Sequence, residues 1–151
     1  MTEYVDEVRL RKHVEALASD IGERNVSKSE SLAAASSYIE AEWRTQGYDV
    51  ARQVYEADGV MCANLEVNRR AEAADGKIIL IGAHYDTVSG SPGADDNASG
   101  IAALLELSRL FAEISPHIAV RFVAFTNEEP PYFTTPPPGQ RRPRARRQEA
   151  R

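Results

Sequence analysis

Apolar residues recur at helical spacing in two stretches near the N-terminus. In residues 4–18 they return with a period close to 3.6, which predicts an amphipathic helix. A second helix is predicted over residues 28–46, ending before Gly47. Ser27, followed three residues later by Glu30, is typical of a capping box at the start of such a helix. Its buried face would consist of Leu32, Ala35, Ile39 and Trp43.

A β-hairpin is predicted after these helices. Residues 48–55 alternate polar and apolar side chains, as a half-exposed strand does. Residues 60–67 have a similar pattern and would form the neighbouring strand. The Ala-Asp-Gly sequence at residues 57–59 is typical of the turn between two paired strands.

Further along the chain, the alternation gives way to a continuous apolar run at residues 77–83, which is typical of a strand covered on both faces. Residues 118–125 are predicted to form a second buried strand. A loop rich in Gly, Ser, Pro and Asp follows the apolar run at residues 87–97, and helical spacing predicts a helix over residues 98–113. The order strand, loop, helix, strand is a βαβ unit, in which the two strands are parallel.

Charge and proline content divide the chain into two parts. Residues 1–133 contain 12 Lys and Arg against 22 Asp and Glu, a net charge of −10. Residues 134–151 contain six Arg against one Glu, a net charge of +5, and lack any apolar face. We therefore predict a folded α/β domain over residues 1–133 and a disordered Pro/Arg-rich tail over residues 134–151.

Composition also argues against several functions and partners. The acidic body argues against nucleic acid as a partner, and the arginines of the tail would support only salt-sensitive, non-specific binding. No apolar run approaches the 18 or so residues of a membrane span, so we expect no membrane partner. Cys62 is the single cysteine, which excludes an internal disulfide. The N-terminus lacks the pattern of a secretory signal, and we expect a cytoplasmic protein. The sequence does not predict the oligomeric state.

Imidazole and carboxylate side chains gather where the predicted parallel strands end. His84 and Asp86 follow the first buried strand, Asp96 lies in the next loop, and Glu128 and Glu129 follow the second buried strand. Ligands of α/β sheets bind beyond the carboxyl ends of parallel strands. Because histidine and carboxylates are the ligand types of hydrolytic zinc sites, the pattern predicts a metal site at this edge.

The spacing within each pair has a physical use. His84 and Asp86 are two residues apart on an extended segment, so both side chains leave the same face and the carboxylate can fix the ring. Adjacent Glu128 and Glu129 point in different directions, which leaves one for the metal and the other for a water molecule.

Three segments resemble peptidase family M28, the co-catalytic zinc aminopeptidases. They are His84-Tyr-Asp-Thr-Val, Gly93-Ala-Asp-Asp-Asn-Ala-Ser-Gly100 and Asn127-Glu-Glu129. The segment Ile21-Gly-Glu-Arg24 also fits the N-terminal portion of that family. The likeness covers residues 8–133, the N-terminal part of the domain. It implies an α/β fold of the zinc-exopeptidase type, with a mixed, largely parallel sheet flanked by helices.

The resemblance also implies a function and a role for each candidate residue. The activity would be that of a zinc-dependent, aminopeptidase-like exopeptidase that hydrolyses peptides with two zinc ions. His84 would bind one ion, Asp96 would bridge both, and Glu129 would bind the second. Asp86 would orient His84, and Glu128 would be the general base.

The same resemblance implies two further ligands, an Asp and a His, downstream of the glutamate pair. Residues 130–151 contain neither, so we expect an incomplete form of the enzyme in which the strand at residues 118–125 has an unpaired edge. Three alternatives stay open. One is an M20-type amidohydrolase or carboxypeptidase, which shares the His-x-Asp-Thr-Val and Glu-Glu pattern. The others are a cyclase-like member of the M28 fold and a fragment without catalytic activity.

Overall fold

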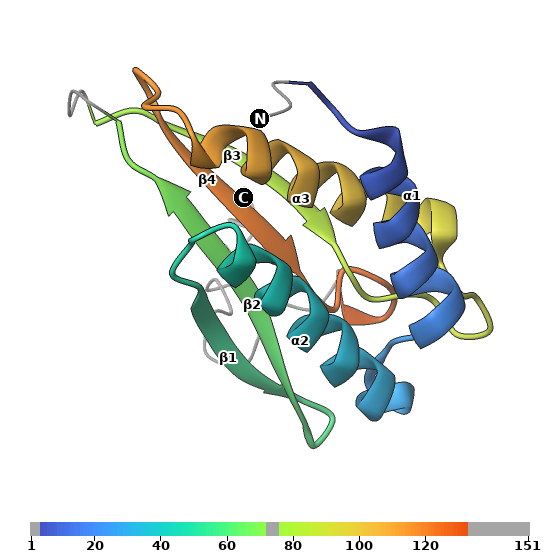
Figure 1. The fold of residues 1–151 in the computed structure, drawn as a ribbon. Helices are drawn as coiled ribbons and strands as arrows, with labels where there is room; N and C mark the ends of the chain where they lie inside the picture. Colours follow the sequence, from blue (N-terminus) through green and yellow to red (C-terminus); the bar gives the residue numbers. More distant parts are fainter. Residues whose placement is uncertain (1–3, 72–75, 133–151) are drawn as a thin grey trace, which may run out of the picture.

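The computed structural model describes residues 4–71 and 76–132, and the elements follow the predicted order. The helices of this part are α1 (Glu7–Glu15), α2 (Ser29–Thr45) and α3 (Ser99–Ala112) (Figure 1). The strands are β1 (Ala51–Ala57), β2 (Val60–Arg69), β3 (Ile78–His84) and β4 (Ala119–Phe125). Short helical turns lie at Ala16–Ile21, Val26–Lys28 and Ala94–Ala98.

The strands form one mixed sheet in the order β1-β2-β4-β3. β1 pairs antiparallel with β2, and β2 pairs antiparallel with β4. β3 and β4 are parallel neighbours, with α3 between them in the chain, so the predicted βαβ unit is confirmed. The predicted mixed α/β fold is confirmed too. The expectation of a largely parallel sheet was wrong for the described strands, because β2 pairs antiparallel with both of its neighbours and β3–β4 is the one parallel pairing.

The helices cover one face of the sheet (Figure 1). α2 and α3 pack directly on the strands, and α1 packs on α3. The core between these layers is apolar and closed, and its largest fully buried side chains include Trp43, Phe122, Leu65, Ile101 and Leu105. A buried indole N–H needs a hydrogen-bond acceptor, and that of Trp43 donates to the Ser108 hydroxyl, 2.9 Å away. The predicted inner face of α2 is therefore confirmed.

Strand β3 is not covered on both faces, so this prediction was wrong for the described part of the chain. β3 lies at one end of the strand order, and Ile78, Ile79 and Leu80 are 54%, 48% and 55% exposed. Only Ala83 of β3 is buried, opposite Ala124 of β4 and facing the core. An apolar run indicates that a strand can be buried, but its neighbours decide whether it is.

The expectation of an unpaired edge along β4 was also wrong. β4 lies between β2 and β3 and pairs with both, so its backbone is hydrogen-bonded on each side. Its side chains are correspondingly buried, with Phe122 and Ala124 fully enclosed. In the described residues the edge strands are β1 and β3. The long-range antiparallel pairing of β2 with β4 places β4 at the centre, and no local pattern predicts such a pairing.

The element ends follow local chemistry, with one correction. Asp58 and Gly59 have φ angles of 49° and 79°, so the predicted hairpin turn has the two positive φ values of a type I′ turn. The capping box at Ser27 was wrong, because the Asn25 carboxamide accepts the Lys28 N–H and caps a 3₁₀ turn that precedes α2. Ser27 instead donates its hydroxyl to Asn25.

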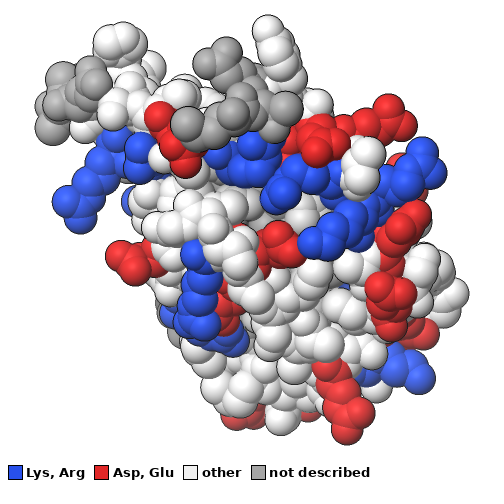
Figure 2. Space-filling model, viewed as in Figure 1, with Lys and Arg blue, Asp and Glu red and all other residues white. Residues whose placement is uncertain are grey.

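The predicted tail at residues 134–151 lies outside the described residues. Within the described ranges, 4–71 and 76–132, no helix is both long enough and apolar enough to cross a membrane. The acidic and basic side chains of the helix-covered face are interspersed, and both signs occur along α1 and α3 (Figure 2).

Candidate active site

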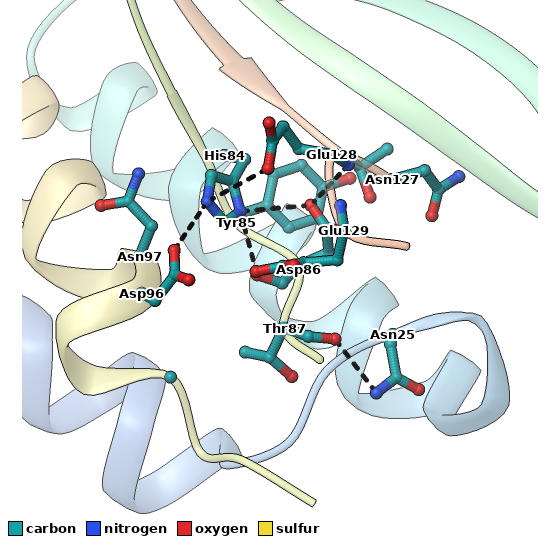
Figure 3. Close-up of polar contacts among 12 residues, drawn as sticks. Asn25, His84, Tyr85, Asp86, Thr87, Asp96, Asn97, Asn127, Glu128 and Glu129 are labelled. Atoms are coloured by element: carbon teal, nitrogen blue, oxygen red, sulfur yellow. Dashed lines mark hydrogen bonds and ion pairs between the residues drawn. The ribbon is translucent and has the colours of Figure 1, made fainter. Parts of the chain in front are cut away.

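The two parallel strands end side by side and bring the predicted site residues together. His84 is the last residue of β3 and is paired with Phe125, the last residue of β4. The segments that follow them, residues 85–87 and 126–129, therefore leave the sheet at the same edge (Figure 3). The Ala94–Ala98 turn that carries Asp96 packs against the end of β3. All five predicted site residues meet at this edge.

Three of these residues could hold a metal ion. Ligand atoms of His84, Asp96 and Glu129 all lie within 4.8 Å of one another. His84 Nε2 is 3.0 Å from Asp96 Oδ1 (Figure 3). Ligands of the same zinc ion lie 2.0–2.2 Å from it and hence at most about 4.4 Å from one another, so small side-chain rotations bring Asp96 to a shared ion with either of the other two residues. The donor types and the geometry both fit zinc.

Asp86 is buried behind the imidazole and serves several neighbours. Its carboxylate is 2% exposed and lies 3.5 Å from His84 Nδ1. The same carboxylate accepts the backbone N–H of Glu128 at 3.2 Å and that of Glu129 at 3.1 Å. Sequence reasoning assigned Asp86 only to His84. The structure shows that it also holds the backbone from which both glutamates extend.

Negative charge dominates the electrostatics of the site. The hydrogen-bonding partner Asp86, followed by the nearby carboxylates of Glu128 and Asp96, raises the pKa of His84 to about 9. Burial, and then the charge of Asp96, raises the pKa of Glu129. These carboxylates repel one another without a cation between them. A divalent ion would relieve this repulsion and displace the proton from His84.

The two adjacent glutamates, which were expected to point in different directions, also differ in exposure. Glu129 is half-buried and turned toward His84 and Asp96. The side chain of Glu128 is 57% exposed, and its Oε2 lies 3.7 Å from His84 Nε2. Glu128 thus borders the same centre from the solvent side. It can accept a proton from a molecule that enters there.

Sequence reasoning gave no role to Asn127, whose backbone conformation directs the glutamate pair. Asn127 has a φ of 59°, in the left-handed region that asparagine tolerates better than most residues. Its Nδ2 donates to the Tyr55 hydroxyl at 3.2 Å, and that hydroxyl donates to the Thr126 carbonyl at 2.9 Å. An Asn directly after a strand and before two acidic residues is the local signal that could have indicated this conformation.

The turn that carries Asp96 depends on two glycines. Gly93 has a φ of 58°, and a Cβ there would lie 2.4 Å from Thr87 Cγ2. Its carbonyl accepts the Ala98 N–H at 3.0 Å, which closes the turn around Asp96. A Cβ on Gly100 would lie 2.1 Å from Asn97 Oδ1, the atom that accepts the Gly100 N–H. At Gly93 the backbone carbonyl of Asp96, 2.5 Å from such a Cβ, leaves no room for a side chain, whereas at Gly100 a side chain would displace the Asn97 carboxamide.

A cavity of about 370 Å³ adjoins the cluster. Asp86 and Glu129 line it from the site, and Asn25, Asp58 and Tyr132 line it from elsewhere in the fold. Its position beside Glu129 provides space for part of a ligand next to the candidate metal centre.

Comparison with protein families gives one match to this region. Residues 64–133 match the sequence model of peptidase family M28. The matched segment contains β3, the Asp96 turn, α3, β4 and the glutamate pair.

Curated relatives share these segments over part of their own length. The uncharacterized protein YfbL of Escherichia coli is 37% identical over 83% of this chain and 41% of its own length. The aminopeptidase YwaD of Bacillus subtilis is 44% identical over a shorter stretch, 34% of this chain and 11% of YwaD. The chain thus spans less than half the length of these relatives.

Solved structures share the fold. BSAP, a zinc aminopeptidase from Bacillus subtilis, superposes with a TM-score of 0.74 at 13% identity, over 85% of this chain and 63% of that protein. The glutaminyl cyclase of Porphyromonas gingivalis superposes with a TM-score of 0.69 at 26% identity, over 83% of this chain and 46% of the cyclase. The predicted zinc-exopeptidase type of fold is confirmed by these likenesses. Residues 64–133 therefore match peptidase family M28 in sequence, and the described part of the chain shares the fold of a zinc aminopeptidase.

Proposed function

We propose that this chain carries catalytic residues of a zinc-dependent exopeptidase of the aminopeptidase type. The observation that carries the proposal is the convergence of His84, Asp96 and Glu129 at the ends of parallel strands, with Glu128 on the solvent side. The family match and the names of YwaD and BSAP support peptide hydrolysis and zinc. They also favour M28 chemistry over an M20-type amidohydrolase.

Within this proposal, His84 through Nε2, together with the carboxylates of Asp96 and Glu129, would hold a two-zinc centre in which Asp96 would be shared. Asp86, near Nδ1, keeps that nitrogen protonated and thus leaves Nε2 free as a ligand. Zinc, when bound, supplies Lewis-acid polarisation of the scissile carbonyl and lowers the pKa of the attacking water.

Glu128 performs the proton transfers. As a carboxylate it accepts one proton from the attacking water while the water oxygen forms a bond to the carbonyl carbon. It then returns this proton to the departing nitrogen as the C–N bond breaks, so the products are a free amino acid and a shortened peptide. The exposed position of Glu128 places it next to an incoming peptide without the need to move a buried charge.

A second candidate function is the cyclisation of an N-terminal glutamine. The likeness to the Porphyromonas gingivalis glutaminyl cyclase at 26% identity favours it. In that reaction the substrate's own amine would attack its side-chain amide and ammonia would leave. Glu128 would carry the proton from the amine to the departing ammonia, so the same side chains serve either reaction.

Product analysis with the zinc-loaded chain separates these functions. Aminoacyl-p-nitroanilides, the same compounds with an acetylated amine, and glutaminyl peptides would be offered in parallel. The proposal requires release of p-nitroaniline from the free-amine compounds and none from the acetylated ones. Ammonia release from glutaminyl peptides alone would favour the cyclase. Cleavage of acetylated substrates, or bound zinc without any turnover, would contradict the proposal for this chain.

A further inference from the structure

We propose that Arg24 is a positioning residue that sets the separation of His84 and Asp96, and thereby the affinity of the site for zinc. Arg24 lies outside the catalytic cluster and touches neither side chain. The inference rests on the proposed zinc site and deepens it, because it concerns how the ligands are held.

The Arg24 guanidinium is completely buried and donates only to backbone carbonyls. Nε donates to the Tyr85 carbonyl at 2.6 Å, Nη1 to the Pro92 carbonyl at 2.6 Å, and Nη2 to the Gly93 carbonyl at 3.1 Å. Nη1 also donates to the carbonyls of Leu17 and Gly22 at 3.1 and 3.0 Å, and these bonds hold the guanidinium against the segment that precedes Arg24.

The carbonyls of Tyr85 and Gly93 belong to the two segments that carry the candidate metal ligands. Tyr85 lies between His84 and Asp86, so its carbonyl fixes the backbone directly after the imidazole. Gly93 begins the turn that carries Asp96, and its carbonyl also accepts the Ala98 N–H. One planar side chain therefore spans the loop between the ligands and ties its two ends together.

The Arg24 backbone strengthens the same connection. Its N–H donates to the Thr87 hydroxyl at 3.1 Å, and its carbonyl accepts the Thr87 N–H at 2.9 Å. Next to it, Asn25 Nδ2 donates to the Thr87 carbonyl at 3.2 Å (Figure 3). The segment around Arg24 is thus docked on the residues that follow His84.

Only arginine can make this connection at the present geometry. Its five N–H groups lie in one rigid plane, whereas lysine has a single nitrogen with three donors. Burial of the charge is unfavourable and lowers the pKa of Arg24 to about 10, although the nearby negative charge of Asp86 opposes this shift. A buried cation that is bonded only through carbonyls holds those carbonyls in fixed positions.

The test compares Arg24→Lys with Arg109→Lys in the full chain. Arg109 bonds Glu106 within α3, so it supports the fold away from the candidate site. For each variant, the zinc dissociation constant is measured by competition with a chromophoric chelator, and the melting temperature is measured without metal. We expect Arg24→Lys to weaken zinc binding by about 10- to 100-fold, as for other residues that orient ligands. Arg109→Lys should lower the melting temperature and leave the zinc dissociation constant unchanged.

A second readout does not require metal. Amide exchange of Ala98, whose N–H is bonded to the Gly93 carbonyl, reports whether the Asp96 turn is held. Arg24→Lys should accelerate this exchange, and Arg109→Lys should not. If Arg24→Lys does not fold, Thr87→Val, which removes the acceptor of the Arg24 N–H, should weaken zinc binding in the same direction.

The possible failures are distinguishable. Zinc affinity of Arg24→Lys equal to that of the parent would overturn the inference and leave the proposed function standing. The inference would also be overturned if the weaker zinc binding of Arg24→Lys were accounted for entirely by the fraction of the variant that is unfolded, because Arg24 would then only stabilise the fold. Failure of the parent chain to bind zinc would count against the proposed function, and Ala98 exchange would still decide whether Arg24 holds the turn.

Discussion

At the scale of single residues, the candidate site is organised around Asp86 rather than around its exposed ligands. The buried carboxylate faces His84 Nδ1 and accepts two backbone N–H groups from the glutamate pair. A buried carboxylate with several hydrogen-bond donors fixes the position of each donor. The chemical types and the spacing of the site residues were predictable from the sequence. The backbone bonds of Asp86, the left-handed Asn127 and the buried Arg24 were not, because they depend on contacts between distant segments.

Glu128→Gln separates proton transfer from metal binding. Glutamine has the shape of glutamate but cannot accept a proton, so hydrolysis of aminoacyl-p-nitroanilides should fall by at least about 10²-fold. Bound zinc, measured by atomic absorption after dialysis, should not change. Glu129→Gln is the matched control and should lose zinc as well as activity. If Glu128→Gln lost zinc and Glu129→Gln retained it, the proposed roles of the two residues would be exchanged.

At the scale of secondary-structure elements, α1 is tied to α3 by a buried carboxylate. Glu106 of α3 accepts the Asp6 N–H at 2.9 Å and is paired with Arg9 and Arg109. Burial alone would raise the pKa of Glu106, but the hydrogen bonds from Arg109 and Asp6 outweigh burial and lower the pKa. The ionised form of Glu106 is therefore stabilised in the folded chain, and it links the N-terminal helix to the βαβ unit.

This link predicts a specific pH dependence of stability. A carboxylate with a lowered folded pKa stabilises the fold fully above its unfolded pKa, near 4.5, and this contribution is lost as the pH falls through the lowered folded value. Glu106→Gln should reduce the free energy of unfolding by about 1–3 kcal/mol at pH 7. The difference between variant and parent should shrink below pH 4.5, as measured by urea denaturation. Exposed Glu7→Gln should have almost no effect at either pH. If the difference in the free energy of unfolding between Glu106→Gln and the parent stayed constant down to pH 3, the proposed role of ionised Glu106 would be contradicted.

Most elements were predictable because their signals are local. The Asp-Gly turn at residues 58–59, the inner face of α2 and the strand–helix–strand order of the βαβ unit each depend on neighbouring residues. The two errors in the sheet have a common cause, since each concerns a partner strand that lies far away in the sequence, whereas the error at Ser27 is local. β3 has the apolar run of a buried strand but lies at the edge, whereas β4 is central because β2 pairs with it. At Ser27, the side chain of Asn25 competes successfully for the helix start.

At the scale of the whole molecule, one edge of the described sheet exposes apolar side chains. Ile78, Ile79 and Leu80 are about half exposed along β3, and β3 pairs on one side only among the described strands. An apolar edge strand invites pairing with another chain. The same strand carries His84 at its end, so the edge adjoins the candidate site.

Self-association through β3 is therefore expected for this chain. Leu80→Lys places a charge on the edge and should weaken association by about tenfold, as expected when one buried leucine is lost. The free energy of unfolding should change by less than about 0.5 kcal/mol, because Leu80 is half exposed. Ala103→Lys, on the exposed side of α3, adds the same charge as a control. Sedimentation velocity over a range of concentrations gives the result, and equal association of the two variants would rule out β3 as the contact.

The central claim is that His84, Asp96 and Glu129 together hold zinc. Equilibrium dialysis of the full chain against zinc tests it most directly, with Asp96→Ala compared with Asp95→Ala. Asp95 is the adjacent, exposed carboxylate of the same turn and lies outside the ligand cluster. The account predicts that the parent and Asp95→Ala bind zinc equally and that Asp96→Ala loses it. Equal zinc binding by Asp96→Ala and Asp95→Ala, or no binding by the parent, would contradict it.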